Sequence, residues 1–313
     1  MNTQSSNMPA SNMSDSFEAQ MLAPAALSPT RPMYWSVRRE LWENRSIYIA
    51  PLAAAAVFLV GFLLSLIHLP QRMRALSTLD LAHQRAAIAM PYDMVAGLLM
   101  FTWMIVGAFY CLGALHGERR DRSILFWKSL PVSDLTTVLA KASIPFVVLP
   151  LLTFVITVVT QFIMLLLSTA VWSASGLNVA TLWTQLSFPQ MSLMLLYHLV
   201  TVHTLWYAPL YGWLLLVSAW ARRAPFLWAA LPPLAIGFGE KIAFNTSHFA
   251  TFLLHRLGGG TEAMTAPGTM PMDPTTHLTP GTYLASPGLW LGLLFTALCI
   301  AAAVRLRRYR GAL

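Results

Sequence analysis

Histidines inside apolar sequence are the first candidates for chemistry in this chain. His198 and His203 lie in one long apolar stretch, and His68 ends another. Imidazole can ligate haem iron or relay protons. However, His203 follows His198 by five positions, which places the two rings on different faces of a helix, and their stretch holds no acidic residue. We therefore predict packing or lining roles for them and keep a haem or metal protein as an alternative function.

A charged pair, Glu240 and Lys241, interrupts another apolar run that begins near Pro225. Ionisable side chains are costly to bury among apolar groups, so residues of this kind are candidates for function by default. We consider Glu240 and Lys241 as candidate gating residues. Glu240 is also a residue that the alternative haem or metal enzyme would use.

Methionines gather in the segment from Glu262 to His277, which is rich in Pro and Thr. Thioether sulfur selects Cu(I), and this segment contains Met264, Met270 and Met272. Because the chain has 16 methionines in all, a chance grouping in a flexible loop is the stronger interpretation. We predict no metal and no cofactor on this chain.

Familiar catalytic motifs are absent from the sequence. No Ser/His/Asp or HExxH arrangement occurs, and the apolar stretches hold no paired carboxylates. The only lysines are Lys128, Lys141 and Lys241, and none lies in a GxxxxGK[ST] loop that could cradle phosphates. We predict that the chain is not an enzyme and has no ATPase site of its own.

The composition is that of a membrane protein. Hydrophobic residues make up 57% of the 313 residues and charged residues 10%, whereas soluble domains carry about a quarter charged residues. So few charges cannot cover the surface of a soluble domain. The net charge of +8 does not indicate nucleic acid, because the basic residues lie between apolar runs. Cys111 and Cys299 both lie in apolar segments, so neither disulfides nor thiolate metal sites are indicated.

Six apolar stretches predict an all-α integral membrane protein with about six transmembrane helices, since about 20 residues cross the hydrocarbon core. The fifth stretch is predicted to be broken, because Glu240 and Lys241 come too early for a simple span. Within a transmembrane domain over 47–310, the predicted spans are 47–67, 93–115, 143–168, 192–219, 225–252 and 287–304.

The positions of Lys and Arg predict the orientation, because basic loops stay in the cytoplasm. With six spans, fifteen of these residues lie on the side of both termini and five on the other side. The first outer loop is the weak point, since it holds Arg72, Arg74 and Arg85. We predict a multi-pass protein with both termini cytoplasmic, in which a C-terminal cluster serves topology: Arg305, Arg307, Arg308 and Arg310.

Two segments precede the first span. Residues 1–32 are rich in Ser, Asn, Pro and Met and are predicted to be a disordered tail. In residues 33–46, Tyr34, Val37 and Leu41 recur at helical spacing, with tryptophans beside them. This pattern predicts an amphipathic elbow helix at the membrane interface. A simple basic flank of the first span is the alternative.

The loop 117–141, between the second and third spans, carries the most informative pattern. It begins with charged residues, continues with an apolar run and is stopped by Pro131. We expect Ser123 to cap a short helix, and Ser133 or Asp134 to cap the next one. An apolar run exposed to the cytosol needs a partner, and this run comprises Ile124, Leu125, Phe126, Trp127 and Leu130. An ordinary charged connector under the lipid headgroups is the alternative.

This loop resembles that of the type-2 ABC exporter permeases, which carry an acidic and basic stretch after span two and then a Leu-Pro-Val-Ser-like turn. The run Phe126-Trp127-Lys128 is bulkier than is usual in that family. The resemblance covers most of the chain. It includes the elbow-like helix, Arg39-Glu40 and Asn44-Arg45 before a proline-containing first span, the six spans and the broken element between spans five and six. The matching loop residues are Glu118, Arg119, Asp121, Ser123, Leu130, Pro131, Val132, Ser133 and Lys141.

The resemblance implies the permease subunit of an ATP-driven exporter in a bacterial inner membrane. In that family the loop is a coupling helix that docks into a groove of a separate ATPase. Two ATPase copies, which bind ATP and Mg²⁺, would serve a dimer of this chain with itself or with a homologous permease. The partner-binding residues that the resemblance implies are Glu118, Arg119, Asp121, Ser123, Ile124, Leu125, Phe126, Trp127, Leu130 and Pro131.

The resemblance also gives Glu240 and Lys241 a structural role. In related permeases short helices re-enter from the outer face after span five. The prolines and glycines of residues 232–239 would then break the helix, and the two charges would neutralise each other at the boundary. A non-transporting anchor or sensor stays open as a further function. The apolar lining of the spans would suit lipids, hydrophobic peptides or drugs alike.

Overall fold

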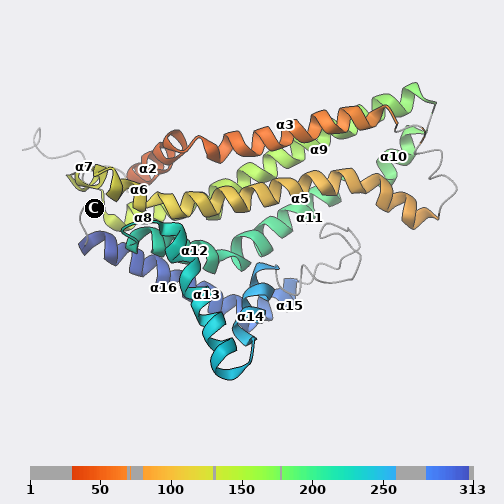
Figure 1. Ribbon diagram of the computed structural model, residues 1–313. Coiled ribbons are helices and arrows are strands. Elements are labelled where there is room, and N and C mark those ends of the chain that lie inside the picture. Colours follow the sequence, from red (N-terminus) through yellow and green to blue (C-terminus); the bar gives the residue numbers. More distant parts are fainter. Residues whose placement is uncertain are drawn as a thin grey trace, which may run out of the picture.

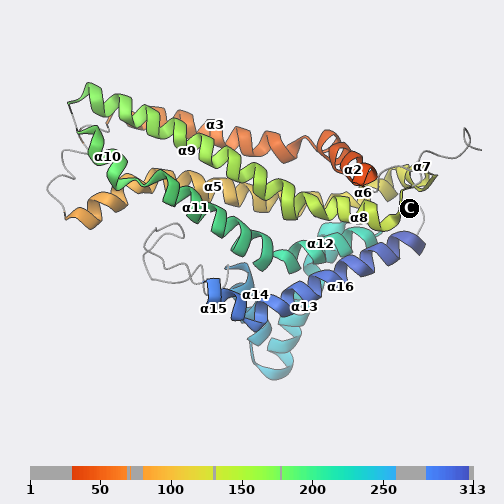
Figure 2. The same cartoon turned by 180° about the vertical axis from the view of Figure 1, so that it is seen from behind.

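The computed structural model describes residues 30–68, 71, 80–129, 132–176, 178–258 and 280–309, and all regular structure in these ranges is helical. Several long helices run along the length of the molecule (Figures 1 and 2). In chain order, and with π-helices marked η, the elements are α2 (Thr30–Glu43), α3 (Ser46–Leu66), α5 (Leu81–Ala114), α6 (His116–Arg120), α7 (Ser123–Ser129), α8 (Asp134–Ser143), η1 (Ile144–Val148), α9 (Leu149–Ala174), α10 (Val179–Gln185), α11 (Phe188–His198), η2 (Leu199–Trp206), α12 (Ala208–Trp220), α13 (Pro225–Phe244), α14 (His248–Leu257), α15 (Pro280–Ala285) and α16 (Pro287–Tyr309).

Membrane-length helices are present as predicted. A bent pair, Val179–Trp206 and Ala208–Trp220, adds a fifth candidate span if it counts as one. The all-α class with several long apolar helices is therefore confirmed for the described residues. The four helical stretches that are long and apolar enough to cross a membrane by themselves are Ser46–Leu66, His83–Arg120, Asp134–Ala174 and Pro287–Tyr309.

Helix α5 lies at the centre of the described bundle. It packs against α3, α9 and α12, and α12 lies on the side away from α3 (Figure 1). Two clusters of buried apolar side chains line its length, one around Trp103 and Tyr211 and the other around Tyr92. The outward faces are apolar as well, with Val57 of α3 and Phe109 of α5 exposed. An apolar outer surface of this kind is suited to lipid and not to water.

The predicted fourth span, 192–219, is not a straight helix. Helix α11 continues into η2, and α12 leaves after a break at Tyr207, so the two halves meet at an angle of 46°. Pro209 lies in the first turn of α12 and has no backbone N–H to continue the ladder of hydrogen bonds. The apolar composition of this stretch predicts the length of the span but not the kink within it.

Helices α12 and α16 pack side by side in parallel. A Cβ atom on Gly212 would lie 3.1 Å from the Cα atom of Thr296, so the two backbones approach closely at this level. Ala219, further along α12, shares a buried cluster with Ala303, further along α16. The C-terminal ends of α12 and α16 therefore lie at the same end of the bundle. The chain that connects the two helices has to run back along the bundle, from the C-terminal end of α12 to the N-terminal end of α16.

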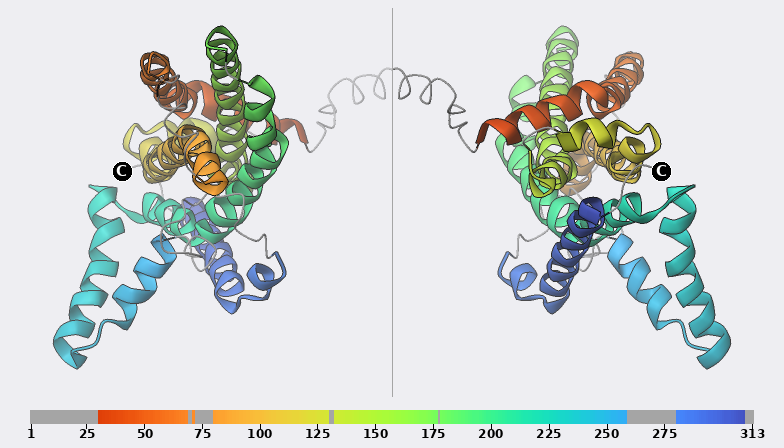
Figure 3. Two further views of the ribbon diagram at one scale, coloured as in Figure 1. Left: turned by 90° about the vertical axis from the view of Figure 1, so that its right-hand side faces the viewer. Right: turned by 90° about the vertical axis from the view of Figure 1, so that its left-hand side faces the viewer.

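The hairpin of α13 and α14 lies in this return. Helix α13 runs through both of its prolines without a break, and Asn245, with a φ of 53°, turns the chain toward α14. The interruption therefore falls at residues 245–247 and not at 232–239, because Asn245 adopts the left-handed conformation that ends a helix. No residue of α13 is buried, and Figure 3 shows the hairpin standing out from the bundle.

Helix α2 precedes the first candidate span as a separate element, three residues earlier at each end than the predicted 33–46. Val37 and Leu41 pack against the core of the bundle. The ring of Trp42 is exposed, and the guanidinium carbon of Arg38 lies 4.6 Å from its centroid. The amphipathic pattern therefore corresponds to a real helix, and its position at a membrane surface stays a prediction.

Several predicted features lie outside the described residues. They are the N-terminal tail up to residue 29, Arg72 and Arg74 of the first outer loop, Leu130 and Pro131 of the loop 117–141, the methionine-containing segment 262–277, and Arg310. The first two residues of the predicted Leu-Pro-Val-Ser-like turn are thus not described, whereas Val132 and Ser133 are.

Candidate functional site: an ion network behind the α6–α7 segment

The α6–α7 segment, residues 116–129, follows the end of α5 and turns back on itself. Arg122, between its two helices, has a φ of 58°. The start of α6 is held by Ser218 of α12, whose Oγ accepts hydrogen bonds from the N–H groups of Leu115 (3.0 Å) and His116 (2.9 Å). Because these N–H groups at the helix start are satisfied by another helix, the segment has a fixed position on α12.

Arg119 attaches the same segment to the end of α12. Its buried guanidinium donates from Nη1 to the carbonyl oxygens of Ala219 (2.6 Å) and Ala221 (3.3 Å). The last carbonyls of a helix lack intrahelical partners and favour a cation. Arg119 therefore faces into the protein and is not at the surface of the segment, against the expectation that it contacts a partner.

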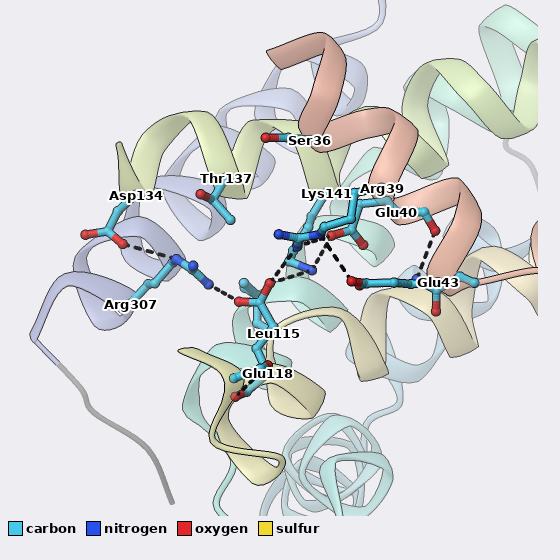
Figure 4. A network of polar contacts seen from close by, with 12 residues as sticks. Ser36, Arg39, Glu40, Glu43, Leu115, Glu118, Asp134, Thr137, Lys141 and Arg307 are labelled. Atoms are coloured by element: carbon cyan, nitrogen blue, oxygen red, sulfur yellow. Dashed lines mark hydrogen bonds and ion pairs between the residues drawn. The ribbon is translucent and has the colours of Figure 1, made fainter. Parts of the chain in front are cut away.

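Glu118 lies at the centre of a buried ion network (Figure 4). Its Oε1 atom is 3.0 Å from Nη2 of Arg39 and 3.2 Å from Nζ of Lys141, and its Oε2 atom accepts a hydrogen bond from Arg307. Three other helices, α2, α8 and α16, thus meet at one carboxylate of α6. The sequence places Glu118 among the partner contacts, but its side chain is buried and points into the network.

A second carboxylate, Glu40 of α2, is only 1% exposed. Its Oε1 atom is 2.7 Å from Nζ of Lys141 and 2.8 Å from Nη2 of Arg39, and its Oε2 atom accepts from the hydroxyl of Tyr110 at 2.8 Å. Tyr110 belongs to α5, so the central helix takes part too. Lys141, 2% exposed, bridges the two carboxylates, and its burial is tolerable because both surround it.

Arg307 closes the network at the C-terminal helix. Its Nε atom is 3.1 Å from Oδ1 of Asp134 at the start of α8, while Nη1 binds Glu118. Glu43 lies at the edge of the network, with Oε1 3.4 Å from Nε of Arg39. In the interior three cations face three carboxylates and their charges balance: Arg39, Lys141 and Arg307 against Glu40, Glu118 and Asp134.

The surrounding cations also act on the protonation of Glu118, which lies beyond the apolar part of α5. Burial acts to raise the pKa of this carboxyl group, but Lys141 and Arg307 beside it outweigh burial and hold the pKa below its ordinary value. The group therefore stays ionised at neutral pH. An ionised Glu118 keeps all three of its cationic partners.

Arg307 corrects the assignment of the C-terminal arginines to topology alone. It is buried and bound on two sides, whereas Arg305 and Arg308 of the same cluster are exposed. One member of the cluster thus has a structural role in the network. Arg305 and Arg308 keep the topological interpretation as a prediction.

Helix α7 covers the network from outside. The guanidinium carbon of Arg39 lies 3.8 Å from the ring centroid of Trp127, a distance suited to a cation–π contact. Ile124 is buried, whereas Leu125 and Phe126 are each 60% exposed. The apolar run predicted as one surface is therefore divided. Ile124 and Trp127 hold α7 in place, whereas Leu125 and Phe126 face outward.

Of the predicted helix caps, Ser133 is confirmed, because its Oγ atom accepts from the N–H group of Thr136 (3.0 Å) at the start of α8. Ser123 begins α7 but does not cap it, since its hydroxyl lies 3.4 Å from the carbonyl oxygen of Glu118 and donates to it. Asp121 is exposed and pairs with its neighbour Arg120 at 3.0 Å.

The histidines form no common site. His198 hydrogen-bonds through Nδ1 to the carbonyl of Met194 (3.0 Å) on its own helix, and the ring of His203 stacks on Trp103 with centroids 5.0 Å apart. Within the described part of the chain, no group of three His, Cys, Asp or Glu side chains could hold a metal ion.

Glu240 caps helix α14. Its carboxylate accepts from the hydroxyl of Thr246 (2.7 Å) and from the N–H groups of His248 (2.7 Å) and Phe249 (2.8 Å). A carboxylate at a helix start satisfies free N–H groups and suits the helix dipole. This role accounts for Glu240 within the hairpin. Lys241 is exposed, and the expected ion pair between the two residues is not among the contacts of the described chain.

The sequence pattern names several members of the network separately, namely Glu118, Asp134, Lys141 and Arg307, but it does not predict that they meet. Lys141 and Glu118 were named because of the loop pattern, but their partners lie on α2, α5 and α16, far away in the chain. One signal in the sequence could have indicated the network. Charged residues lie next to the ends of apolar stretches in four separate places. Comparisons of this chain with protein-family models, with curated proteins and with solved structures find no match.

Proposed function

We propose that this chain is the membrane-spanning subunit of an ATP-driven exporter, and that its α6–α7 segment receives the movement of a separate ATPase. The observation that supports the proposal is the ion network, which connects this segment to four other helices through buried charges. A connector without such a role has no need of buried charges behind it. Leu125 and Phe126, exposed on the other side of the segment, provide apolar surface for the ATPase.

The network gives the segment a mechanical function. Separating a buried cation from its carboxylate leaves an unpartnered charge and costs about 3–5 kcal/mol. A push on α7 is therefore passed to α2, α8 and α16 together, and the end of the bundle moves as a unit. Closure of two ATPases would tilt the second and third spans in this way and open the interface between two permease copies to the outside.

The six-span topology is part of the proposal. The parallel packing of α12 and α16 supports it, because the chain has to return from the C-terminal end of α12 to the N-terminal end of α16. In our proposal α13 with α14 supplies the outward crossing and α16 the inward one. Arg39, near the start of the described chain, and Arg307, near its end, then lie on the cytoplasmic side with the network.

Purification tests the proposed partner directly. Pulling down the tagged chain from a mild detergent extract of its native membranes should bring along an ATPase with a phosphate-binding GxxxxGK[ST] loop, and mass spectrometry identifies it. ATP hydrolysis in the eluate should be sensitive to a lysine substitution in that loop. A purified chain that never carries an ATPase, although it is intact and inserted, would contradict the proposal.

Single cysteines test the topology in sealed cells, since Cys111 and Cys299 are buried. An impermeant thiol reagent added outside should label D80C and N178C but not D121C and R223C. Labelling of D121C from outside would place the α6–α7 segment on the wrong side of the membrane for a cytoplasmic ATPase.

A further inference from the structure

A second buried cation, Arg256 of α14, has a very different environment from the ion network. Only 8% of the residue is exposed. Its Nη1 atom donates to the carbonyl of Gly288 (2.9 Å), and its guanidinium carbon lies 4.2 Å from the ring centroid of Trp206. The Nη2 atom is buried and has no hydrogen-bond partner. No carboxylate of the described ranges forms an ion pair with it.

The contrast with the network is one of charge balance. Every cation of the network faces carboxylates, whereas Arg256 is held by one carbonyl oxygen and one aromatic ring. A buried guanidinium without an anion is costly, since neither contact replaces the lost hydration. An anion brought to Arg256 would therefore gain a charge-assisted, two-pronged hydrogen bond.

The position of Arg256 depends on a glycine of α16. A Cβ atom on Gly292 would lie 1.8 Å from Nη2 of Arg256 and 2.9 Å from the ring of Pro209. The guanidinium therefore occupies space that only glycine leaves free. We call this place, formed by Trp206, Gly288 and Gly292, the arginine seat.

The seat is also where α14 attaches to the bundle, whereas α13 is held near its start by Trp213, whose Nε1 atom donates to the carbonyl of Ala229 (3.1 Å). Trp206 donates from Nε1 to the carbonyl of Arg256 (3.0 Å), and the hydroxyl of Tyr207 donates to the carbonyl of Leu257 (2.7 Å). Arg256 is the only buried residue of α14, and α13 has none. Few apolar contacts oppose the separation of the hairpin from the seat, so release of Arg256 costs little packing.

We propose that Arg256 is an anion-recognition residue, which leaves the arginine seat to bind the phosphate group of an amphiphile. Phosphate matches the planar fork of a guanidinium, and an apolar chain matches the surroundings of the seat. Phe252, one turn before Arg256 on the same face of α14, is exposed and would contact such a chain. The proposal stands without the exporter assignment, because it requires no ATPase.

Binding of dodecyl phosphate to the full chain in a neutral maltoside detergent tests the proposal, with thermal unfolding against ligand concentration as the measurement. The phosphate compound should raise the unfolding temperature of the natural chain. R256Q should bind it about tenfold more weakly or worse, as loss of a charge-assisted contact predicts. R305Q, which removes an exposed arginine of α16, is the matched control and should bind as the natural chain does.

Inorganic phosphate in place of dodecyl phosphate distinguishes a free anion from a headgroup. If both compounds stabilise the natural chain and neither stabilises R256Q, the result supports the site and shows that the phosphate group is sufficient for binding. Stabilisation by dodecyl phosphate alone supports recognition of an amphiphile. No stabilisation of the natural chain by either compound, or equal stabilisation of R256Q, would overturn the proposal.

G292A keeps the positive charge but fills the seat, so it separates recognition from folding. If Arg256 binds the anion outside the seat, G292A should bind dodecyl phosphate more tightly than the natural chain does, because the filled seat keeps Arg256 outside it. A purely structural arginine would give lower stability in G292A without any gain in phosphate binding. Loss of binding in G292A as large as in R256Q, with the variant folded, contradicts release from the seat.

Discussion

Two buried arginines lie at opposite ends of helix α16, and their surroundings differ. Near its C-terminal end, Arg307 binds Glu118 and Asp134 within a balanced network. Near its N-terminal end, the carbonyl of Gly288 holds Arg256, whose second terminal nitrogen has no partner. The same guanidinium group is thus a fixed element at one end and a releasable one at the other, and the difference lies in the carboxylates around it.

This difference suggests a division of labour along the molecule. In the proposed function, the end that carries the network passes a movement between helices, and paired buried charges resist the separation of these helices. At the other end, α14 is joined to the bundle by a few hydrogen bonds, each of which contributes about 1 kcal/mol. We therefore expect the hairpin to separate from the bundle long before the network does.

The largest effect is expected for K141M, which removes the cation between Glu40 and Glu118 but keeps the length of the side chain. Both carboxylates lose a buried partner, and the free energy of unfolding should fall by about 3–5 kcal/mol. Chemical unfolding in detergent measures it. The matched control is K241M, on the exposed Lys241, which should change stability by about 0.5 kcal/mol or less. Equal losses in the two variants would show that the network is not the stable end.

A smaller effect is expected for W127A, which removes the ring over Arg39. The lost cation–π contact predicts a destabilisation of about 1 kcal/mol, and the lost burial of the ring adds to it. L125A is the control, because Leu125 is exposed. If thermal unfolding shifts as much in L125A as in W127A, the division of α7 into an inner and an outer side is wrong.

The smallest effect is expected at the hairpin for Y207F, which removes one hydrogen bond to the carbonyl of Leu257. Global stability should fall by about 1 kcal/mol or less. Amide hydrogen exchange in α14 should nevertheless become faster, while exchange in α8 stays unchanged, because only the hairpin opens. Faster exchange in both α14 and α8 would mean that the hairpin and the network open together. The two regions would then not differ in stability as we expect.

Much of this fold follows from local pattern. Long apolar runs gave the helices of α3, α5, α9 and α16, and Ser133 gave the start of α8. Two features were not visible in this way. The kink at Tyr207 depends on Pro209 and on a change of helix type in η2, and the hairpin turn depends on Asn245, which adopts a left-handed conformation. Neither changes the apolar composition on which span prediction depends.

The candidate site was only partly predictable, because ion pairs join residues that are far apart in the chain. Glu118 and Arg307 are separated by 189 positions, and nothing in the sequence around Arg307 distinguishes it from the exposed Arg305. The loop pattern identified the correct segment but not the direction of its side chains. Burial of Glu118, Arg119 and Ile124 leaves Leu125 and Phe126 as its apolar surface.

The central claim is that this remaining surface of α7 contacts an ATPase. The most direct test is the affinity of the purified partner for the double variant L125A/F126A in nanodiscs. Both side chains are exposed, so the variant should insert and unfold as the natural chain does. Loss of two apolar side chains at the centre of a contact should weaken association by about 2 kcal/mol or more, roughly thirtyfold in the dissociation constant. An unchanged dissociation constant, together with unchanged stimulation of ATP hydrolysis, would contradict the account.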